Sequence, residues 1–545
     1  MKKKLIALTL TALMGFSVLA GCGGNQAAEG GDEAAGESTE PKIVRHNLGA
    51  DPQTIDPALN SAVDGAIVLV NVFEGLCKTD ENEKAVPGMA ESWEVSEDGL
   101  TYTFKLRDAK WSDGEPVKAQ DFEYAWKRAL DPTTAAEYAY QMYYLKGGEA
   151  FNSGEGSIDD VGVKAIDDKT LEVVLESPTP YFLELTAFPT YFPVRKDIVE
   201  ADPEGWALNM ETYISNGPFK AVEWSHNDVL KVVKNENYYD ADSIQLDGID
   251  FYMIVEESTG MSAYESGEID YLEHIPTDQI PTLQESHEDF EIQPYLGTYF
   301  YVFNTTKEPV NDPKVRKALT LAIDRQAIVD VVTKGGQKPA SGFVPPGMTL
   351  SDGSDFREKG GDYGIPATAN VEEAKKLLAE AGYPDGQGFP TIEVIYNTLE
   401  AHKAIAEAIQ EMWKQNLGIN VELRNEEWKV FQETRTQGDF VIARHGWIGD
   451  YVDPMTFLDM WLSNSGNNNA QWKNADYDKL IADSKKAEGA DRDALMMQAE
   501  KLMMDEYITM PIYYYTKPTL LKSYVKGVRF SPLGFVFYHN ATIEK

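Results

Sequence analysis

The sequence is short of cysteine, histidine and positive charge. Of its 545 residues, two are cysteines, Cys22 and Cys77, and seven are histidines. Since Cys22 follows a targeting segment, Cys77 is left alone in the folded body, so we expect no disulfide within it. The scattered histidines suggest no metal site. Lysine and arginine number 49 against 89 aspartate and glutamate, a formal charge of −40. Such a surface repels phosphate, which argues against a nucleic-acid binder.

Sequence motifs of common enzymes are also missing. The chain contains no G-x-S-x-G, H-E-x-x-H, C-x-x-C or G-x-x-x-x-G-K-[ST]. With 89 carboxylates, acid pairs of the glycosidase kind are unavoidable, and nothing selects one of them. We therefore predict that the protein is not an enzyme and has no catalytic residues and no cofactor. A secreted hydrolase of peptides or glycans remains the alternative from another class.

Long apolar runs are lacking except at the N-terminus. Lys2–Lys4 precede a mainly apolar run, Leu5–Ala20, and Gly21 and Cys22 follow this run directly. Small residues before Cys22 resemble a lipoprotein signal, so residues 1–21 are predicted to be removed and the Cys22 thiol to carry lipid, palmitate included. A plain signal peptide with an incidental cysteine is the alternative. The predicted location is extracytoplasmic, anchored to the outer face of the cytoplasmic membrane, or its periplasmic side if there is an outer membrane.

Residues 22–41 are predicted to form a flexible tether. The stretch is dominated by glycine, alanine and glutamate and has no aromatic residue. It cannot bury enough apolar surface to offset the entropy of ordering. The folded body is therefore expected to begin near Lys42.

The body alternates strand and helix patterns, which predicts the α/β class. Alternating apolar residues predict strands, and apolar residues at helical spacing predict helices. The expected strands are 101–107, 170–176, 391–397 and 420–424; the expected helices are 119–130, 371–381, 401–416 and one running from Pro313 through Ile328. No repeat and no long linker interrupts the body. We therefore expect two lobes with a cleft, and a chain that crosses between them more than once.

One segment, residues 440–464, combines an apolar strand with opposite charges. Within eight residues it carries Arg444, His445, Trp447, Asp450 and Tyr451. Arg444 and Asp450 are at most about 20 Å apart if extended, and closer if the chain bends at Gly446 or Gly449. This spacing suits the two ends of a short zwitterion, and a free strand edge can pair with an extended ligand. The alternative is an ordinary strand and loop with solvated charges.

Several segments resemble a known family. They are residues 90–122, 161–182, 266–270, 372–383, 428–438 and 443–451. Together they resemble the family 5 bacterial extracellular solute-binding proteins, which serve peptide and nickel ABC importers, and within that family the oligopeptide-binding branch. The resemblance implies a two-lobed periplasmic-binding-protein-like fold of class II, cluster C type, with an extra small domain in the first lobe.

The resemblance also implies domain boundaries. The first lobe is expected to be discontinuous, built from residues 42–73, 197–297 and 511–545. Residues 74–196 are expected to form the additional small domain, and residues 298–510 the second lobe.

Charged ligand-binding residues follow from the same resemblance. Asp450 matches the residue that pairs with a peptide α-ammonium, and Arg444 one that meets the carboxylate of short peptides. His402 and Arg435 match carboxylate partners for other peptide lengths. Lys334 lies near the family's lysine for longer peptides, although Thr333 competes for that position.

Backbone and aromatic positions complete the expected site. Gly446 and Ile448 match residues whose main chain pairs with the peptide, while Trp428 and Trp447 match pocket aromatics. A relative joins the positions of Gly297 and Ile448 by a disulfide; neither is cysteine here. The pocket near Ile448 is therefore expected to differ in shape from the relative's.

The predicted function is that of an oligopeptide receptor. The protein is expected to capture peptides between its lobes and deliver them to the permease and ATPase subunits of an ABC importer, as a monomer held at the membrane through Cys22. The alternatives within the family are a murein peptide, a signalling peptide, a nickel chelate or an oligosaccharide as the solute.

Overall fold

The computed structural model describes residues 40–545. Within it, Lys42–Lys545 form one compact unit. The predicted signal peptide, Cys22 and all but the last two residues of the predicted tether lie outside the described residues. Among residues 40–545, no helix is long and apolar enough to cross a membrane.

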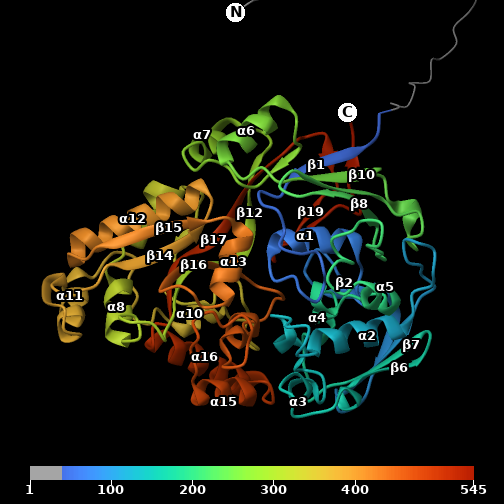
Figure 1. Ribbon diagram of the computed structural model, residues 1–545, viewed down its shortest axis with the longest axis horizontal. Helices are drawn as coiled ribbons and strands as arrows, with labels where there is room; N and C mark the ends of the chain where they lie inside the picture. Colours follow the sequence, from blue (N-terminus) through green and yellow to red (C-terminus); the bar gives the residue numbers. More distant parts are fainter. Residues whose placement is uncertain (1–39) are drawn as a thin grey trace, which may run out of the picture. The chain divides into compact units, whose positions relative to one another are not determined.

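A large mixed sheet runs through the unit. In spatial order its strands are β15 (Val421–Glu426), β14 (Ile392–Asn397), β16 (Ile442–Ile448), β12 (Phe290–Phe303), β17 (Thr509–Leu521), β11 (Tyr271–Leu272), β1 (Ile43–Asn47), β10 (Gly248–Tyr252), β9 (Val229–Lys234) and β8 (Phe219–Ser225), with β13 (Lys338–Pro339) beside β17. The long strands β12 and β17 lie in the middle of this order (Figure 1). The boundaries predicted at 297/298 and 510/511 fall inside these two strands.

The predicted second lobe contains a parallel βαβ unit. Strands β14 and β15 pair in parallel, with Ile392 opposite Val421, and α12 (Glu400–Leu417) connects them. Apolar residues of α12 at helical spacing, Ile405, Ile409 and Trp413 among them, are buried against the sheet. Figure 1 shows α12 together with α8 (Pro313–Leu321) and α11 (Val371–Glu380) around these strands.

One predicted helix is wrong in its length. The helix that begins at Pro313 ends at Leu321, and a short helix, α9 (Arg325–Ala327), and a π-helical turn, Ile328–Thr333, follow. The buried guanidinium of Arg325 donates to the carbonyl oxygens of Pro511 (2.7 Å), Thr320 (3.1 Å) and Ile323 (3.3 Å). The side chain of Asp324 accepts a hydrogen bond from the Ala327 N–H (2.8 Å) and caps the start of α9, so the helical pattern restarts there and does not continue α8.

The segment 74–196 forms its own sheet. Four antiparallel strands lie in the order β4 (Ala90–Val95), β5 (Thr101–Leu106), β7 (Thr170–Val174) and β6 (Val163–Asp167), and α2 (Ala119–Leu130) packs against β6 and β7. As predicted, α2 buries Phe122 and Trp126 and ends before Pro132. A hairpin of β2 (Cys77–Thr79) and β3 (Ala85–Pro87) precedes this sheet, and the predicted boundary at 196/197 falls inside α5 (Lys196–Ala201).

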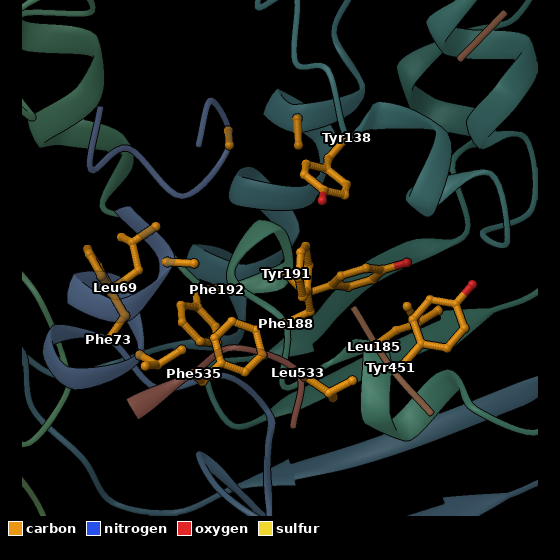
Figure 2. Packing of buried hydrophobic residues seen from close by; sticks show 14 of the residues in the cluster. Leu69, Phe73, Tyr138, Leu185, Phe188, Tyr191, Phe192, Tyr451, Leu533 and Phe535 are labelled. Carbon is orange, nitrogen blue, oxygen red and sulfur yellow. The ribbon is translucent and has the colours of Figure 1, made fainter. Parts of the chain in front are cut away.

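Distant parts of the chain share one core. Leu69 and Phe73 come from α1 (Val63–Val72) and the residue that follows it, Phe188 from the segment 74–196, and Leu533 and Phe535 from the C-terminal segment. Figure 2 shows these side chains gathered in one cluster. The C-terminal segment therefore returns to pack beside α1.

Candidate binding site

A cavity of about 560 Å³ lies among elements of the two predicted lobes. Its lining includes the start of α1, residues 273–275, α13 (Trp428–Thr436), β16 and the loop that follows β16. All residues from Arg444 to Asp450 line it. The segment that the sequence singles out therefore forms one wall of the cavity.

This wall has an unpaired strand edge. Strand β16 pairs with β12 along its whole length, from Ile442 opposite Phe303 to Ile448 opposite Gly297. On its other side, β14 reaches only Ile442 and Ala443. Within residues 40–545, no strand pairs with residues 444–448 on that side. A backbone edge facing a cavity can form a ladder with an extended ligand.

Asp450 lies at the end of this edge and is buried, with 8% of its surface exposed. Its carboxylate accepts hydrogen bonds from Tyr138 Oη (3.0 Å), Gln141 Nε2 (2.6 Å) and Thr456 Oγ1 (3.1 Å). No ion pair with Asp450 occurs within the described part of the chain. Burial raises the pKa of Asp450 well above its usual range, against the lowering effect of these hydrogen bonds. A buried carboxylate without a cation favours a positively charged ligand.

Two buried guanidiniums supply the opposite charge. Arg444 and Arg435 are each 9% exposed and line the cavity, and neither forms an ion pair with a described residue. Arg444 donates to Tyr515 Oη (2.8 Å) and lies over the Tyr299 ring, 4.7 Å from its centroid. The Nε atoms of both arginines are buried without a hydrogen-bond partner, and burial lowers the pKa of Arg435 to about 10. Both side chains suit a carboxylate.

His402, the third residue predicted to meet the ligand's carboxylate, is buried near Arg444. It lines the cavity, with its Nδ1 3.4 Å from Tyr299 Oη. Burial, with Arg444 nearby, lowers its pKa well below the usual range, so the imidazole is neutral at physiological pH. Without its charge it can still form a hydrogen bond to a carboxylate or carbonyl group.

The predicted backbone and aromatic positions also line the cavity. Trp447 is buried and donates from Nε1 to the carbonyl oxygen of Thr456 (2.8 Å), while half-buried Trp428 donates to Asp64 Oδ2 (2.9 Å). Ile448 and Gly446 lie on the free edge of β16. A Cβ at Gly446 would overlap the Tyr515 hydroxyl, so a larger residue there would require Tyr515 to move.

Lys334 is the sequence-derived candidate that lies outside the cavity lining. Lys334 is half-buried in a left-handed conformation (φ 55°) and is not among the residues that line the cavity, whereas Thr333 is. Gly297 and Ile448 are direct cross-strand partners in β12 and β16. Here the Ile448 side chain occupies the space beside Gly297.

Sequence reasoning misses the groups that surround these anchors. Tyr138 and Gln141 bind Asp450 from about 310 residues away, so no local pattern could reveal them. Asp51 is also missed. It accepts a hydrogen bond from Lys429 Nζ at 2.6 Å, which joins the first predicted lobe to the second.

The sheet topology, the free strand edge and the opposed buried charges define a solute-binding protein of the periplasmic-binding-protein class. The sequence model of a protein family, the bacterial extracellular solute-binding proteins, family 5, matches residues 84–469. This chain belongs to that family, and the predicted family and fold class are confirmed.

Individual relatives match over nearly the full length. The oligopeptide-binding protein OppA of Bacillus subtilis is 41% identical over 551 residues, covering 99% of each chain. OppA of Listeria monocytogenes, solved bound to peptide, is 31% identical with a TM-score of 0.88, covering 93% of this chain and all of that one.

A third relative distinguishes two arrangements of the fold. The Escherichia coli murein tripeptide binding protein MppA has a TM-score of 0.87, covering 93% of this chain and 99% of that one. An unliganded open form of MppA scores only 0.61, covering 93% and 98%. Identity is 35% in both cases, so the difference reflects the arrangement of the chain and not its sequence. Residues 40–545 therefore differ in arrangement from the open form.

Proposed function

We propose that this protein binds oligopeptides in the 560 Å³ cavity, with the peptide extended along the free edge of β16. The observation that carries the proposal is the pair of uncompensated buried charges in one cavity. Asp450 receives the α-ammonium, and Arg444 or Arg435 receives the carboxylate, with His402 as a further partner. Each of these side chains replaces, by a hydrogen bond or an ion pair, the hydration that a charged peptide terminus loses on burial.

The arrangement explains how one site accepts many peptide sequences. Main-chain pairing with residues 444–448 and recognition of the two termini do not depend on side chains. Two arginines and a histidine at separate chain positions provide partners for peptides of different length. Lys334, outside the cavity lining, would act only on a peptide that reaches beyond it.

The wider function is transport. We propose that residues 298–510 close against residues 42–73, 197–297, 511–545 and the small domain around the peptide, and that the closed form docks on the permease of an ABC importer. In this proposal the protein is an extracytoplasmic monomer anchored through lipid on Cys22. The family membership and the peptide-binding relatives support it. Loss of labelled palmitate in a Cys22→Ser variant would test the anchor.

Peptide pools with and without a free amino group test the binding proposal. Thermal unfolding of the ligand-free protein from residue 22 onward is followed with tri- to pentapeptides, either free or N-acetylated. A ligand at 100 times its Kd stabilises the folded state by about 2.7 kcal/mol. We expect stabilisation by the free pool and much less by the acetylated pool. Equal stabilisation would refute the role of Asp450, and no stabilisation by either pool would refute peptide binding.

A further inference from the structure

A second cavity, of about 290 Å³, shares a wall with the first. Phe188, Asp450, Leu533 and Phe535 line both cavities. Figure 2 shows Phe188, Leu533 and Phe535 close together in the shared apolar cluster. The anchor for the peptide's amino end therefore lies where the two cavities meet.

The second cavity contains a buried carboxylate that lacks a partner for one oxygen. Glu74, 5% exposed, accepts a hydrogen bond from Tyr238 Oη at its Oε2 (2.5 Å). Its Oε1 is buried without a hydrogen-bond partner. The nearest ammonium, on Lys78, is 3.7 Å from Oε2, and burial raises the pKa of Glu74.

A second carboxylate repeats this arrangement. Glu83, 4% exposed, accepts a hydrogen bond from Arg529 Nη1 at its Oε1 (3.0 Å), while its Oε2 is buried without a partner. Burial raises the pKa of Glu83 despite the neighbouring guanidinium of Arg529. Two buried carboxylate oxygens in one cavity are thus left without donors, and this situation is costly in a folded protein.

Acidic side chains outnumber basic ones in the lining of the second cavity. The acidic side chains of the second cavity are Glu74, Asp80, Glu83, Glu184 and Asp450. Against them stand only Lys78 and Arg529, because burial lowers the pKa of His539 to about 4 and leaves it neutral. The cavity therefore favours a cation that donates hydrogen bonds.

We propose that the second cavity is a subsite for a positively charged side chain, lysine or arginine, on the first residue of the bound peptide. This inference rests on the proposed function, since the α-ammonium at Asp450 brings the first residue to the shared wall. The apolar stem packs against Phe188 and Phe535, and the charged head donates to the free oxygens of Glu74 and Glu83. The protein thus selects peptides with a basic first residue.

Peptides that differ in one charged group test this subsite. Isothermal titration calorimetry compares tetrapeptides whose first residue is lysine or norleucine, followed by three alanines. Norleucine keeps an aliphatic stem of similar length and lacks the ammonium group. We expect the lysine peptide to bind about tenfold more tightly or better, the gain of a charge-assisted hydrogen bond. Moving lysine to the second residue should remove the advantage.

Variants locate the effect. In Glu83→Gln and Glu74→Gln the lysine-to-norleucine affinity ratio should fall toward one, whereas it should persist in the control Glu81→Gln, an exposed residue of the same turn outside both cavities. The wild-type comparison needs no variant, so a failure of either variant to fold leaves the test intact. Equal affinities in wild type, or a ratio that survives both substitutions, would overturn the subsite.

Two further measurements separate the other outcomes. Butylammonium alone tests whether the second cavity binds a free amine. If butylammonium stabilises wild type but not Glu83→Gln, and the lysine and norleucine peptides bind equally well, the cavity binds a free cation and the side-chain assignment is overturned. A tetrapeptide of alanine reports on the proposed function itself. If it binds while lysine gives no advantage, only the subsite fails; if no peptide binds, the proposed function fails.

Discussion

Replacing Asp450 with asparagine should have opposite effects on ligand binding and on the stability of the free protein. In the complex, the peptide ammonium would lose its only carboxylate partner in the proposed site. Removing one partner of a buried ion pair costs about 3–5 kcal/mol, which corresponds to an affinity loss of about 10²- to 10⁴-fold. In the ligand-free protein, the same change removes a buried acid whose ionised form is unfavourable, because no described cation compensates its charge.

The surroundings of Asp450 can accept the amide. Gln141 Nε2 and the hydroxyl groups of Tyr138 and Thr456 all donate to the carboxylate. Because Gln141 Oε1 is buried without a partner, a flip of this side chain presents an acceptor to the new amide group. The variant should therefore fold, and its melting temperature without peptide should be higher than that of wild type at pH 7.5.

The stability gain should depend on pH in a defined direction. The folded-state pKa of Asp450 is raised above its unfolded value. Its favourable contribution to folding is therefore complete below the unfolded pKa, near 4, and is lost as pH rises through the folded pKa. The difference in melting temperature between Asp450→Asn and wild type should vanish near pH 4 and grow toward neutral pH.

Calorimetry with free and N-acetylated tetrapeptide completes the test. Wild type should discriminate strongly between the two, and Asp450→Asn should discriminate by less than tenfold. The control is Asp439→Asn, an exposed aspartate in the same predicted lobe, which should behave as wild type. Unchanged affinity of Asp450→Asn for the free peptide would refute the reasoning about the site. A lower melting temperature without peptide would refute the reasoning about the uncompensated charge.

Three further predictions concern other charged groups. Arg444→Met should weaken binding of a short free peptide at least about tenfold more than binding of its C-terminal amide, since a charge-assisted hydrogen bond contributes about 1.5–3 kcal/mol; equal losses in calorimetry would contradict this. Lys429→Met should increase the radius of gyration of the ligand-free protein in small-angle X-ray scattering, because the 2.6 Å contact of Lys429 with Asp51 joins the two predicted lobes. An unchanged radius of gyration would show that this contact does not hold the lobes together. Burial raises the pKa of Asp64 to about 6 from a usual 3.8, so its contribution to stability is complete below about pH 4 and lost as pH rises through 6. Asp64→Asn should therefore reduce the fall in melting temperature between pH 5 and 7.5, and an equal fall in both proteins would show that Asp64 does not titrate there.

Elements with local causes are the ones that the sequence predicts well. The helix over 119–130 follows from Phe122 and Trp126 at helical spacing and a proline beyond its end, and the structure has the same bounds. The helix from Pro313 is predicted too long because a new helix starts at Arg325, with the Asp324 side chain as its N-cap, and the Arg325 guanidinium bonds to the carbonyl of Pro511, 186 residues later. A partner so distant leaves no periodic trace.

The same distinction applies to the site. Arg444 and Asp450 could be selected because one strand and its following loop carry both. Two of the donors that hold Asp450 could not, since Tyr138 and Gln141 come from the segment 74–196, about 310 residues earlier in the chain. The free edge of β16 could not be predicted either, because it depends on β14 ending its pairing at Ala443.

The central position of β17 has a consequence for biosynthesis. It lies between β12 and β11, and thereby joins two groups of strands that are otherwise complete before it. A chain that emerges from its N-terminus can pair β1 with β10 and β16 with β12 while residues 509–521 are still missing. During that interval, the edges of β11 and β12 stay open to wrong partners. The last 37 residues of the polypeptide, from Thr509 onward, thus decide whether the two half-sheets become one.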